Sequence, residues 1–132
     1  AYDSKTVEAI EKRINIIKPD IIFTHWPFDT HQAHVAVGKA TISAARRYNT
    51  VYFYEPISPS GRSYVGFRPQ VYVDITDVID IKIAALDAHA TEKNKYGDYW
   101  IRGVTARAVF RGYEMGKMHG EAFEVLREEL VL

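Results

Sequence analysis

The fold class is decided by one stretch of the sequence, Pro19-Asp20-Ile21-Ile22-Phe23-Thr24-His25. Its apolar centre, residues 21–23, is a short continuous run of the kind that buried parallel strands show. A helix is predicted before it, because Pro19 ends a pattern that begins at the N-cap Ser4. In that pattern, apolar residues recur at helical spacing: Val7, Ile10, Ile14 and Ile17. Residues 4–23 are therefore predicted to form a helix, a tight link and a strand.

A polar and aromatic loop, residues 24–31, follows the strand and leads into a second predicted helix over about 34–47. The inner face of that helix is expected to comprise Val37, Ala40, Thr41, Ala44 and Ala45. The loop thus lies at the carboxyl end of a strand and precedes a helix. In open α/β sheets, ligands bind at that place.

The rest of the chain continues the alternation of strands and helices. Strands are predicted at 51–54 and 71–75, separated by a long Pro-containing loop at 56–69. A helix beginning at Thr76 carries Val78, Ile81, Ala85 and His89, the last at the spacing of the inner face. A last helix over about 104–115 is indicated by Ala106, Val109, Phe110 and Tyr113, with Gly116 and Gly120 bracketing its end. No repeat or domain boundary is evident, so residues 1–132 read as one α/β layer structure.

The amino-acid composition excludes several classes of function. The 132 residues are enough for a hydrophobic core, and 47% hydrophobic content is typical of a globular chain. A net charge of zero gives no support to nucleic-acid binding. No stretch is apolar enough to span a membrane. Without cysteine, a disulfide framework and a thiolate nucleophile are excluded, and His and carboxylate remain as metal ligands; a cytoplasmic location is expected.

The start of the sequence raises a further expectation. The chain has no initiator Met and opens almost directly on a predicted helix. We therefore expect it to be the later part of a longer polypeptide.

The main chemical signal is a cluster of titratable residues in ten positions: His25, Asp29, His31 and His34, in a chain with five histidines. His31 and His34 are three residues apart, so at the start of a helix both rings can project to one side. One imidazole could then bind a metal while the other hydrogen-bonds a reacting oxygen. Asp29 is close enough to orient an imidazole. An HxxH pair is also compatible with helix capping or a surface role, and both interpretations remain open.

These residues carry a resemblance to a known family. Two segments, Lys18-Pro-Asp-Ile-Ile-Phe-Thr-His25 and Asp29-Thr-His-Gln-Ala-His34-Val-Ala-Val-Gly38, resemble the second signature of the PIG-L or LmbE-like zinc-dependent de-N-acetylases. Further segments follow in the order such proteins show: Tyr54-Glu-Pro56, Phe67-x-Pro69, Val71-Tyr-Val-Asp-Ile75, Ala88-His-Ala-Thr91, Arg107-Ala108, Arg111-Gly112 and Gly120-Glu-Ala-Phe123.

The resemblance implies a Rossmann-like parallel sheet with flanking helices, and a reaction that removes an acetyl group from an N-acetylglucosamine-type amino sugar. It assigns His34 as one zinc ligand and His31 as the catalytic residue that stabilises the oxyanion or protonates the leaving amine. Asp29 is the other catalytic candidate. Such chemistry is consistent, because zinc polarises the amide carbonyl and a cationic imidazole steadies the tetrahedral intermediate.

The sequence departs from that family in two ways. The acid that usually precedes the last histidine is Ala33, and Asp29 is the candidate to replace it toward His31. The family's His-Pro-Asp-Asp motif, which supplies two zinc ligands and the general base, is absent. Because a catalytic zinc needs about three protein ligands, we expect this chain to be the second half of a larger domain. It should be inactive until a missing N-terminal portion or a complementary chain is supplied.

Substrate contacts are assigned to Trp26, His89 and Arg68, each with a structural alternative. Trp26 could stack on a sugar or pack in the loop. His89 could touch substrate or be buried in its helix, and Arg68 could reach an anionic group or be solvated. A homo-oligomer is expected, since an uncovered strand edge tends to pair. The rival hypothesis is a binding or assembly module that keeps the fold without the full metal site.

Overall fold

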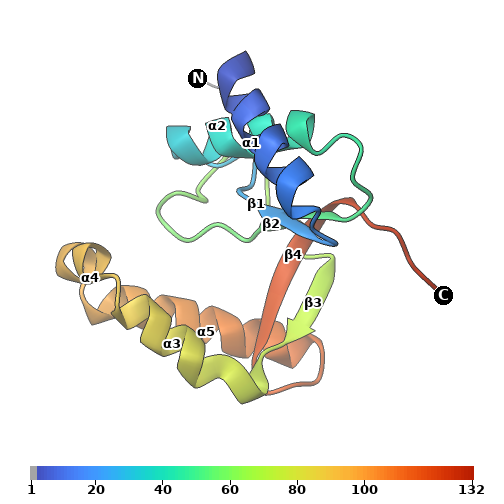
Figure 1. Cartoon of the computed structure of the whole chain (residues 1–132). Helices are drawn as coiled ribbons and strands as arrows, with labels where there is room; N and C mark the ends of the chain where they lie inside the picture. The colour runs from blue at the N-terminus through green and yellow to red at the C-terminus, as the bar shows by residue number, and fades with distance from the viewer. Residues whose placement is uncertain (1–2) are drawn as a thin grey trace. The chain divides into compact units, whose positions relative to one another are not determined.

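The structure, a computed structural model, describes residues 3–132. The chain forms two compact units, which are described separately. The first comprises the residues up to Val71 together with Phe123–Leu132, and the second comprises Tyr72–Ala122. Figure 1 gives the order of the elements along the chain.

The first unit begins with the predicted succession of helix, strand, helix and strand. These are α1 (Ser4–Ile17), β1 (Ile22–Thr24), α2 (Gln32–Ala44) and β2 (Val51–Tyr54). The N-cap of α1 is Asp3 and not Ser4, because the Asp3 carboxylate accepts the Thr6 backbone N–H at 2.9 Å. Lys18, in the left-handed conformation, ends α1 before Pro19. The α/β class predicted from the sequence is confirmed.

The sheet is mixed, with strand order β1-β2-β4-β3. β1 and β2 are parallel, with Ile22 opposite Val51. β4 (Gly120–Arg127) runs antiparallel to β2, with Glu124 opposite Phe53. The prediction of a parallel sheet is thus correct only for β1 and β2. β4 was not predicted, since no strand was assigned after the last predicted helix.

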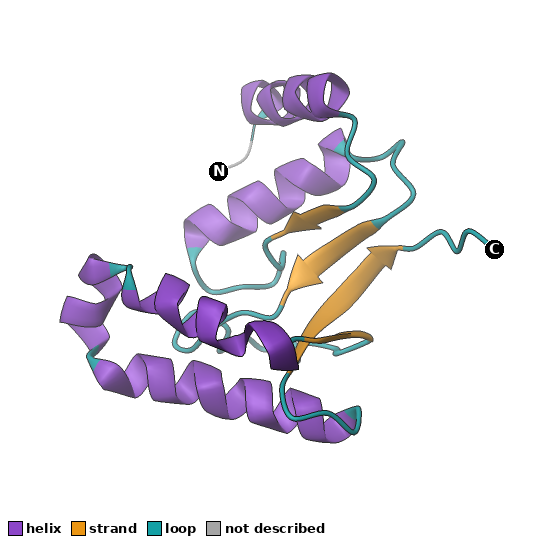
Figure 2. Cartoon of the chain, turned by 60° about the horizontal axis from the view of Figure 1, so that its bottom comes forward, coloured by secondary structure: helices purple, strands orange, loops and turns teal. Residues whose placement is uncertain are grey.

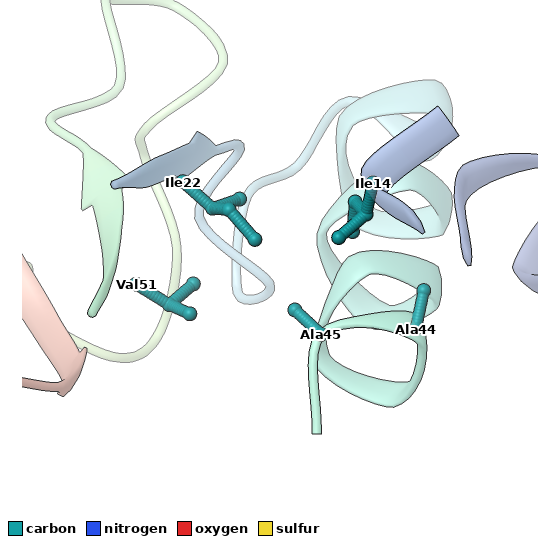
Figure 3. Close-up of a cluster of buried hydrophobic side chains, with 5 residues drawn as sticks. All are labelled: Ile14, Ile22, Ala44, Ala45 and Val51. Atoms are coloured by element: carbon teal, nitrogen blue, oxygen red, sulfur yellow. The ribbon is translucent and has the colours of Figure 1, made fainter. Parts of the chain in front are cut away.

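The core of the first unit lies on one face of its strands, between them and the two helices. Ile14 of α1 and Ala44 of α2 pack with Ile22 and Val51 of the strands, and Ala45 completes the cluster, as Figure 3 shows. Figure 2 shows both helices on the same side of the strands. The short alanine side chains let α2 approach the sheet closely, which sets the position of the loop between β1 and α2.

The second unit consists mainly of helices. Its elements are β3 (Val71–Asp74, whose first residue belongs to the first unit), η1 (Thr76–Val78), α3 (Ile79–Asp87), α4 (Ala90–Tyr96) and α5 (Asp98–Glu114). The predicted strand at 71–75 is confirmed as β3, followed by the buried Ile75. No helix formed by residues 3–132 is sufficiently long and apolar to cross a membrane.

The predicted last helix is confirmed as α5, which begins earlier than predicted, at Asp98. Its buried residues are Val104, Ala108 and Gly112, whereas the four residues that indicated the helix are exposed: Ala106, Val109, Phe110 and Tyr113. The buried face is set by backbone proximity, because Gly112 lies against the turn at 117–119, where a Cβ would come within 2.7 Å of the His119 nitrogen. A periodic pattern of large apolar residues does not contain that information.

Candidate functional site

The loop between β1 and α2 holds the histidine cluster, and a hydrogen-bonded turn shapes it. The Asp29 backbone N–H donates to the Trp26 carbonyl at 3.3 Å. Gly38 of α2 lies against the start of the loop, because a Cβ at this position would be 2.4 Å from the His25 carbonyl oxygen. α2 therefore begins directly beside the end of β1, as predicted for a site at the carboxyl end of a strand.

Asp29 organises this loop. Its carboxylate is buried; Oδ1 accepts the His31 backbone N–H at 3.0 Å, and Oδ2 lies 2.9 Å from His34 Nδ1. Ser60 donates its hydroxyl to the same Oδ2 at 3.3 Å. The Ser60 carbonyl also accepts the Thr30 N–H at 2.8 Å. Both the side chain and the backbone of Ser60 therefore connect the long loop at 56–69 to the loop that holds Asp29.

The three imidazoles form a stack with His34 in the middle. The His25 and His34 ring centroids are 4.1 Å apart and nearly parallel at 4°, and those of His31 and His34 are 4.2 Å apart at 25°. Burial lowers the pKa of His25, and the neighbouring His34 and His31 act in the same direction, while Asp29 opposes them. His25 therefore favours its neutral form.

The structure brings Asp29 to the ring of His34 and not to that of His31. The contact between Asp29 and His31 is made by the His31 backbone N–H. The expectation that Asp29 replaces the missing acid at Ala33 toward His31 is thus not met. Asp29 instead positions His34.

The side chains that could bind a metal can be compared with the coordination that a zinc ion requires. Within residues 3–132 there is no group of three or more His, Cys, Asp or Glu side chains suited to holding a metal. His34 by itself fits the role of one ligand. Its Nδ1 is paired with a carboxylate, which fixes the ring in the manner of metal-bound histidines. Its side chain is 33% exposed, and Nε2 is the ring nitrogen not used in that pairing. The other ligands would have to come from outside these residues.

Trp26 is not available to stack on a sugar, so that assignment is corrected. It is only 1% exposed, and its indole Nε1–H donates to Glu124 Oε2 at 3.1 Å. Its ring contacts Phe28 and Phe67 edge to face at 5.5 and 5.9 Å. The aromatic character of the loop therefore serves packing at this position.

Arg68 is paired with the same buried carboxylate. Its Nη2 and Nε donate to Glu124 Oε1 at 2.7 and 3.2 Å, and its backbone N–H donates to Oε2 at 2.9 Å. This pairing raises the pKa of Arg68 above its ordinary value. The substrate contact predicted for Arg68 stays a prediction, and so does the solvated alternative, because the side chain is paired with Glu124 and is also 69% exposed.

His89 belongs to the second unit, where it is the N-cap residue of α4 and is exposed. The alternative of a buried helical histidine is therefore wrong, since the predicted helix breaks before His89. Its predicted substrate contact stays a prediction. Two residues of the loop network, Ser60 and Glu124, were not identified from the sequence: Ser60 lies in a polar loop without a motif, and Glu124 lies in a strand that was not predicted.

Comparison with known proteins bears on the fold. No protein-family model matches the chain. Among solved structures, it is similar to the conserved protein TT1542 from Thermus thermophilus, with a TM-score of 0.83 and 18% identity over 100% of this chain and 63% of that one. This chain and TT1542 therefore share a fold. The similarity extends to an N,N'-diacetylchitobiose deacetylase from Pyrococcus horikoshii, with a TM-score of 0.74 and 20% identity over 96% of this chain and 52% of that one.

A third similar structure is GalB, a 4-carboxy-2-hydroxymuconate hydratase from Pseudomonas putida KT2440, with a TM-score of 0.76 and 19% identity over 100% of this chain and 62% of that one. One fold thus serves a deacetylase and a hydratase. The present chain spans between about half and just under two thirds of the length of these three proteins.

Proposed function

We propose that this chain is part of a zinc-dependent hydrolase of the PIG-L or LmbE-like family that removes an N-acetyl group from an N-acetylglucosamine-type amino sugar. The fold shared with a diacetylchitobiose deacetylase supports the proposal. So does the sequence signature that places His31 and His34 after β1. Fold alone does not select the reaction, so the reaction is inferred from the histidine site.

The observation that carries the proposal is the pairing of His34 Nδ1 with the buried carboxylate of Asp29 at 2.9 Å. A histidine held in this way presents Nε2 in a fixed direction. Ser60 and the His31 N–H satisfy further lone pairs of the same carboxylate, so Asp29 is itself held in place. A surface histidine that merely caps a helix does not need such support.

Each residue then has a distinct role. Zinc, when bound, would supply Lewis-acid polarisation of the amide carbonyl and a water of lowered pKa. His34 would contribute one ligand through Nε2, and Asp29 would orient its ring. His31, stacked on His34 at 4.2 Å, would donate a hydrogen bond to the developing oxyanion or a proton to the leaving amine.

The proposal includes a portion of polypeptide beyond these residues, expected to precede Ala1, that carries the remaining ligands and the general base. The similar solved chains are longer than this one, which is consistent with such a portion. Without it, the 132 residues should bind zinc weakly and should not hydrolyse the amide.

A second candidate function is a binding or assembly module that has the fold without the zinc chemistry. Two observations favour it: Ala33 stands where the family has an acid, and residues 3–132 hold no group of ligands sufficient for a metal. The two candidates differ in whether His34 is needed for metal content.

The test uses the polypeptide read from the encoding gene with all residues upstream of Ala1. Zinc content and acetate release from N-acetylglucosamine are measured for this polypeptide and for its His34→Ala and His31→Ala variants. We expect His34→Ala to lose both zinc and activity. His31→Ala should retain zinc while kcat falls by about 10²-fold or more, the range typical of a lost general acid or oxyanion donor.

Ser43→Ala, on the same helix α2 and away from the cluster, is the control and should change neither quantity. Unchanged zinc content in the His34→Ala variant would remove the metal assignment and favour the binding module. Acetate release by the 132-residue chain alone, with zinc bound stoichiometrically, would contradict the need for an upstream portion.

A further inference from the structure

The long loop at 56–69 contacts the histidine loop, residues 25–31, at two places. The first is Ser60, which is hydrogen-bonded to Asp29 and Thr30. The second is Phe67, whose ring lies edge to face with that of Trp26 at 5.9 Å. Both loops belong to the first unit. Loops of this length without a helix or strand of their own are uncommon and usually functional.

Ser60 makes three hydrogen bonds to two consecutive residues of the histidine loop. Its hydroxyl donates to Asp29 Oδ2 at 3.3 Å, and its carbonyl accepts the Thr30 N–H at 2.8 Å. The Thr30 hydroxyl donates to the same carbonyl. Because both donors of Thr30 meet one acceptor, Thr30 cannot rotate without breaking at least one of these bonds. This set of three hydrogen bonds is called the Ser60 latch.

Ser60 is itself held by a turn within the long loop. Its N–H donates to the Ile57 carbonyl at 3.0 Å, and its hydroxyl lies 2.9 Å from the same carbonyl. The next residue, Gly61, lies against Pro56, because a Cβ at Gly61 would be 2.8 Å from Pro56 Cγ. A hydroxyl has one proton to donate, so the proton of Ser60 is shared between Ile57 and Asp29. Its effect on Asp29 is therefore at most that of one neutral hydrogen bond.

The Ser60 latch acts next to the two histidines that have roles in the proposed function. Asp29 Oδ2 is paired with His34 Nδ1 at 2.9 Å, and Asp29 Oδ1 accepts the His31 N–H at 3.0 Å. Thr30 lies between Asp29 and His31 in the chain. Asp29 is buried, whereas Thr30 and His31 are exposed. Since exposed residues have little packing to hold them, the hydrogen bonds to Ser60 are what fixes this part of the loop.

We propose that Ser60 and Thr30 are positioning residues of the proposed zinc site. Ser60 acts through the Asp29 carboxylate on the ring of His34, and Thr30 acts through the backbone on His31. The latch holds both imidazoles in place before a metal or a substrate binds, which reduces the ordering that binding requires. This inference rests on the proposed function for the roles of the two histidines, but the latch itself can be measured without metal or substrate.

The second contact between the two loops does not depend on the latch. Trp26 is buried, and its indole N–H donates to Glu124 Oε2 at 3.1 Å. The Arg68 backbone N–H donates to the same oxygen at 2.9 Å. Substitutions at the exposed Thr30 and the half-buried Ser60 should therefore loosen the histidine loop without unfolding the first unit.

Hydrogen exchange tests the latch in the metal-free polypeptide, read from the encoding gene with any residues upstream of Ala1. Ser60→Ala removes the hydroxyl but leaves the carbonyl that accepts the Thr30 N–H. We expect the protection factor of the Thr30 amide to fall by about 3- to 10-fold, the equilibrium change that corresponds to one neutral hydrogen bond. Ser63→Ala, in the same loop, is the matched control, because the Ser63 hydroxyl has no hydrogen-bond partner among residues 3–132. It should leave this protection unchanged.

Zinc affinity separates positioning from a merely structural role. In the same polypeptide, Ser60→Ala should weaken zinc binding by about 3- to 10-fold. Asp29→Ala, which removes the direct partner of His34, should weaken it by about 10- to 100-fold. Because Ser60 acts through Asp29, Ser60→Ala should cause no further loss in the Asp29→Ala background. Two independent structural defects would instead multiply.

Thr30 gives an independent readout through His31. Thr30→Val keeps the size of the side chain and removes the hydroxyl that donates to the Ser60 carbonyl. At saturating zinc, we expect kcat for acetate release to fall by about 3- to 10-fold. Thr30→Ser keeps the hydroxyl and should retain the original kcat.

Three results would each overturn the proposal: unchanged protection of the Thr30 amide in Ser60→Ala, multiplied zinc losses in the double variant, or a Thr30→Ser variant as slow as Thr30→Val. The exchange and Thr30 readouts stand even where Asp29→Ala does not fold. Unchanged zinc content in His34→Ala would remove the proposed function. Loss of Thr30 protection in Ser60→Ala would still establish the latch, so the two proposals can fail separately.

Discussion

Glu124 is a charged residue in a place where charges are rarely found. It is 3% exposed, and its two carboxylate oxygens accept from the Trp26 indole and from the backbone and guanidinium of Arg68. A buried carboxylate is tolerated only when its lone pairs are satisfied. Glu124 thereby joins three segments: β4, the loop before α2 and the segment at 67–70. The loop that ends at Asp29 is held in part by a residue about 100 positions away in the sequence.

We expect Glu124→Ala to lower the free energy of unfolding of the first unit by about 2 kcal/mol, because the Trp26 N–H and the Arg68 backbone N–H lose their acceptor. The ion pair itself adds little to this value, since the Arg68 side chain is 69% exposed and can turn to water. Glu124→Gln keeps the volume and one acceptor and should cost about half as much. Urea denaturation followed by tryptophan fluorescence, with Trp100→Phe as the common background so that Trp26 is the reporter, measures both. Equal losses for the two variants would show that the hydrogen bonds do not stabilise the loop.

At the scale of single residues, the sequence predicted which side chains lie close together but not which hydrogen bonds they form. His25, Asp29, His31 and His34 were predicted together because they lie within ten positions of one another. Their partners come from distant segments: Ser60 reaches Asp29 from 31 residues away. Pairing of this kind depends on tertiary packing, which periodicity and spacing do not encode.

Among the elements, α2 depends on a glycine for its position. Gly38 lies where an added Cβ would be 2.4 Å from the His25 carbonyl oxygen and 3.4 Å from the Pro27 Cα, both backbone atoms of the loop. Backbone atoms cannot turn aside as a flexible side chain can. The close approach of helix and loop, which brings His34 of α2 beside His25, therefore requires glycine at this position.

Gly38→Ala should destabilise the first unit by about 1–3 kcal/mol, the cost of overpacking a tight contact, even though alanine favours a helix by about 1 kcal/mol. Gly103→Ala, within α5, is the matched control because nothing lies within 4 Å of its added Cβ. It should stabilise the second unit by up to about 1 kcal/mol. Hydrogen exchange resolved by residue separates the two units. A neutral or stabilising effect of Gly38→Ala would mean that α2 can move away from the loop.

The start of α1 provides a prediction about pH. The Thr6 backbone N–H and hydroxyl lower the pKa of Asp3 below its ordinary value of 3.8. The ionised cap therefore stabilises α1 above that value, and its contribution disappears as the pH falls through the lowered pKa. The protection factors of the first amides of α1, which are corrected for the pH dependence of intrinsic exchange, should fall in that acidic range. Asp3→Asn, which still caps a helix but does not ionise, should remove this pH dependence, and an unchanged acid response would contradict the assignment.

The elements themselves were predictable to different degrees, for physical reasons. Pro19 and the apolar run after it predicted the end of α1 and the position of β1, because a residue that ends helices is followed there directly by a hydrophobic segment. β4 was not predicted, and its partner β2 is about 70 residues away in the sequence. In α5, the large apolar residues Val109 and Phe110 are exposed while Ala108 and Gly112 are buried. Close helix packing favours small residues, so the large apolar residues that indicate this helix do not mark its buried face.

At the scale of the whole molecule, zero net charge and exposed apolar side chains act together. Seventeen Lys and Arg balance seventeen Asp and Glu. Ile21, Phe23 and Tyr54 are each between 41% and 48% exposed. Charge repulsion normally keeps such surfaces apart in solution, and it is weakest at zero net charge. The 132-residue chain should therefore attract copies of itself most strongly near neutral pH.

Static light scattering measures this attraction as the osmotic second virial coefficient. We expect the coefficient of the 132-residue chain to be lowest near pH 7 and to rise by pH 9, where deprotonation of amines leaves a net negative charge. Ile21→Lys should raise it at pH 7, because the substitution adds a charge and interrupts the apolar face, whereas Ile21→Leu, which does neither, should leave it unchanged. If the two variants behaved alike, the exposed apolar surface around Ile21 would not mediate the self-attraction.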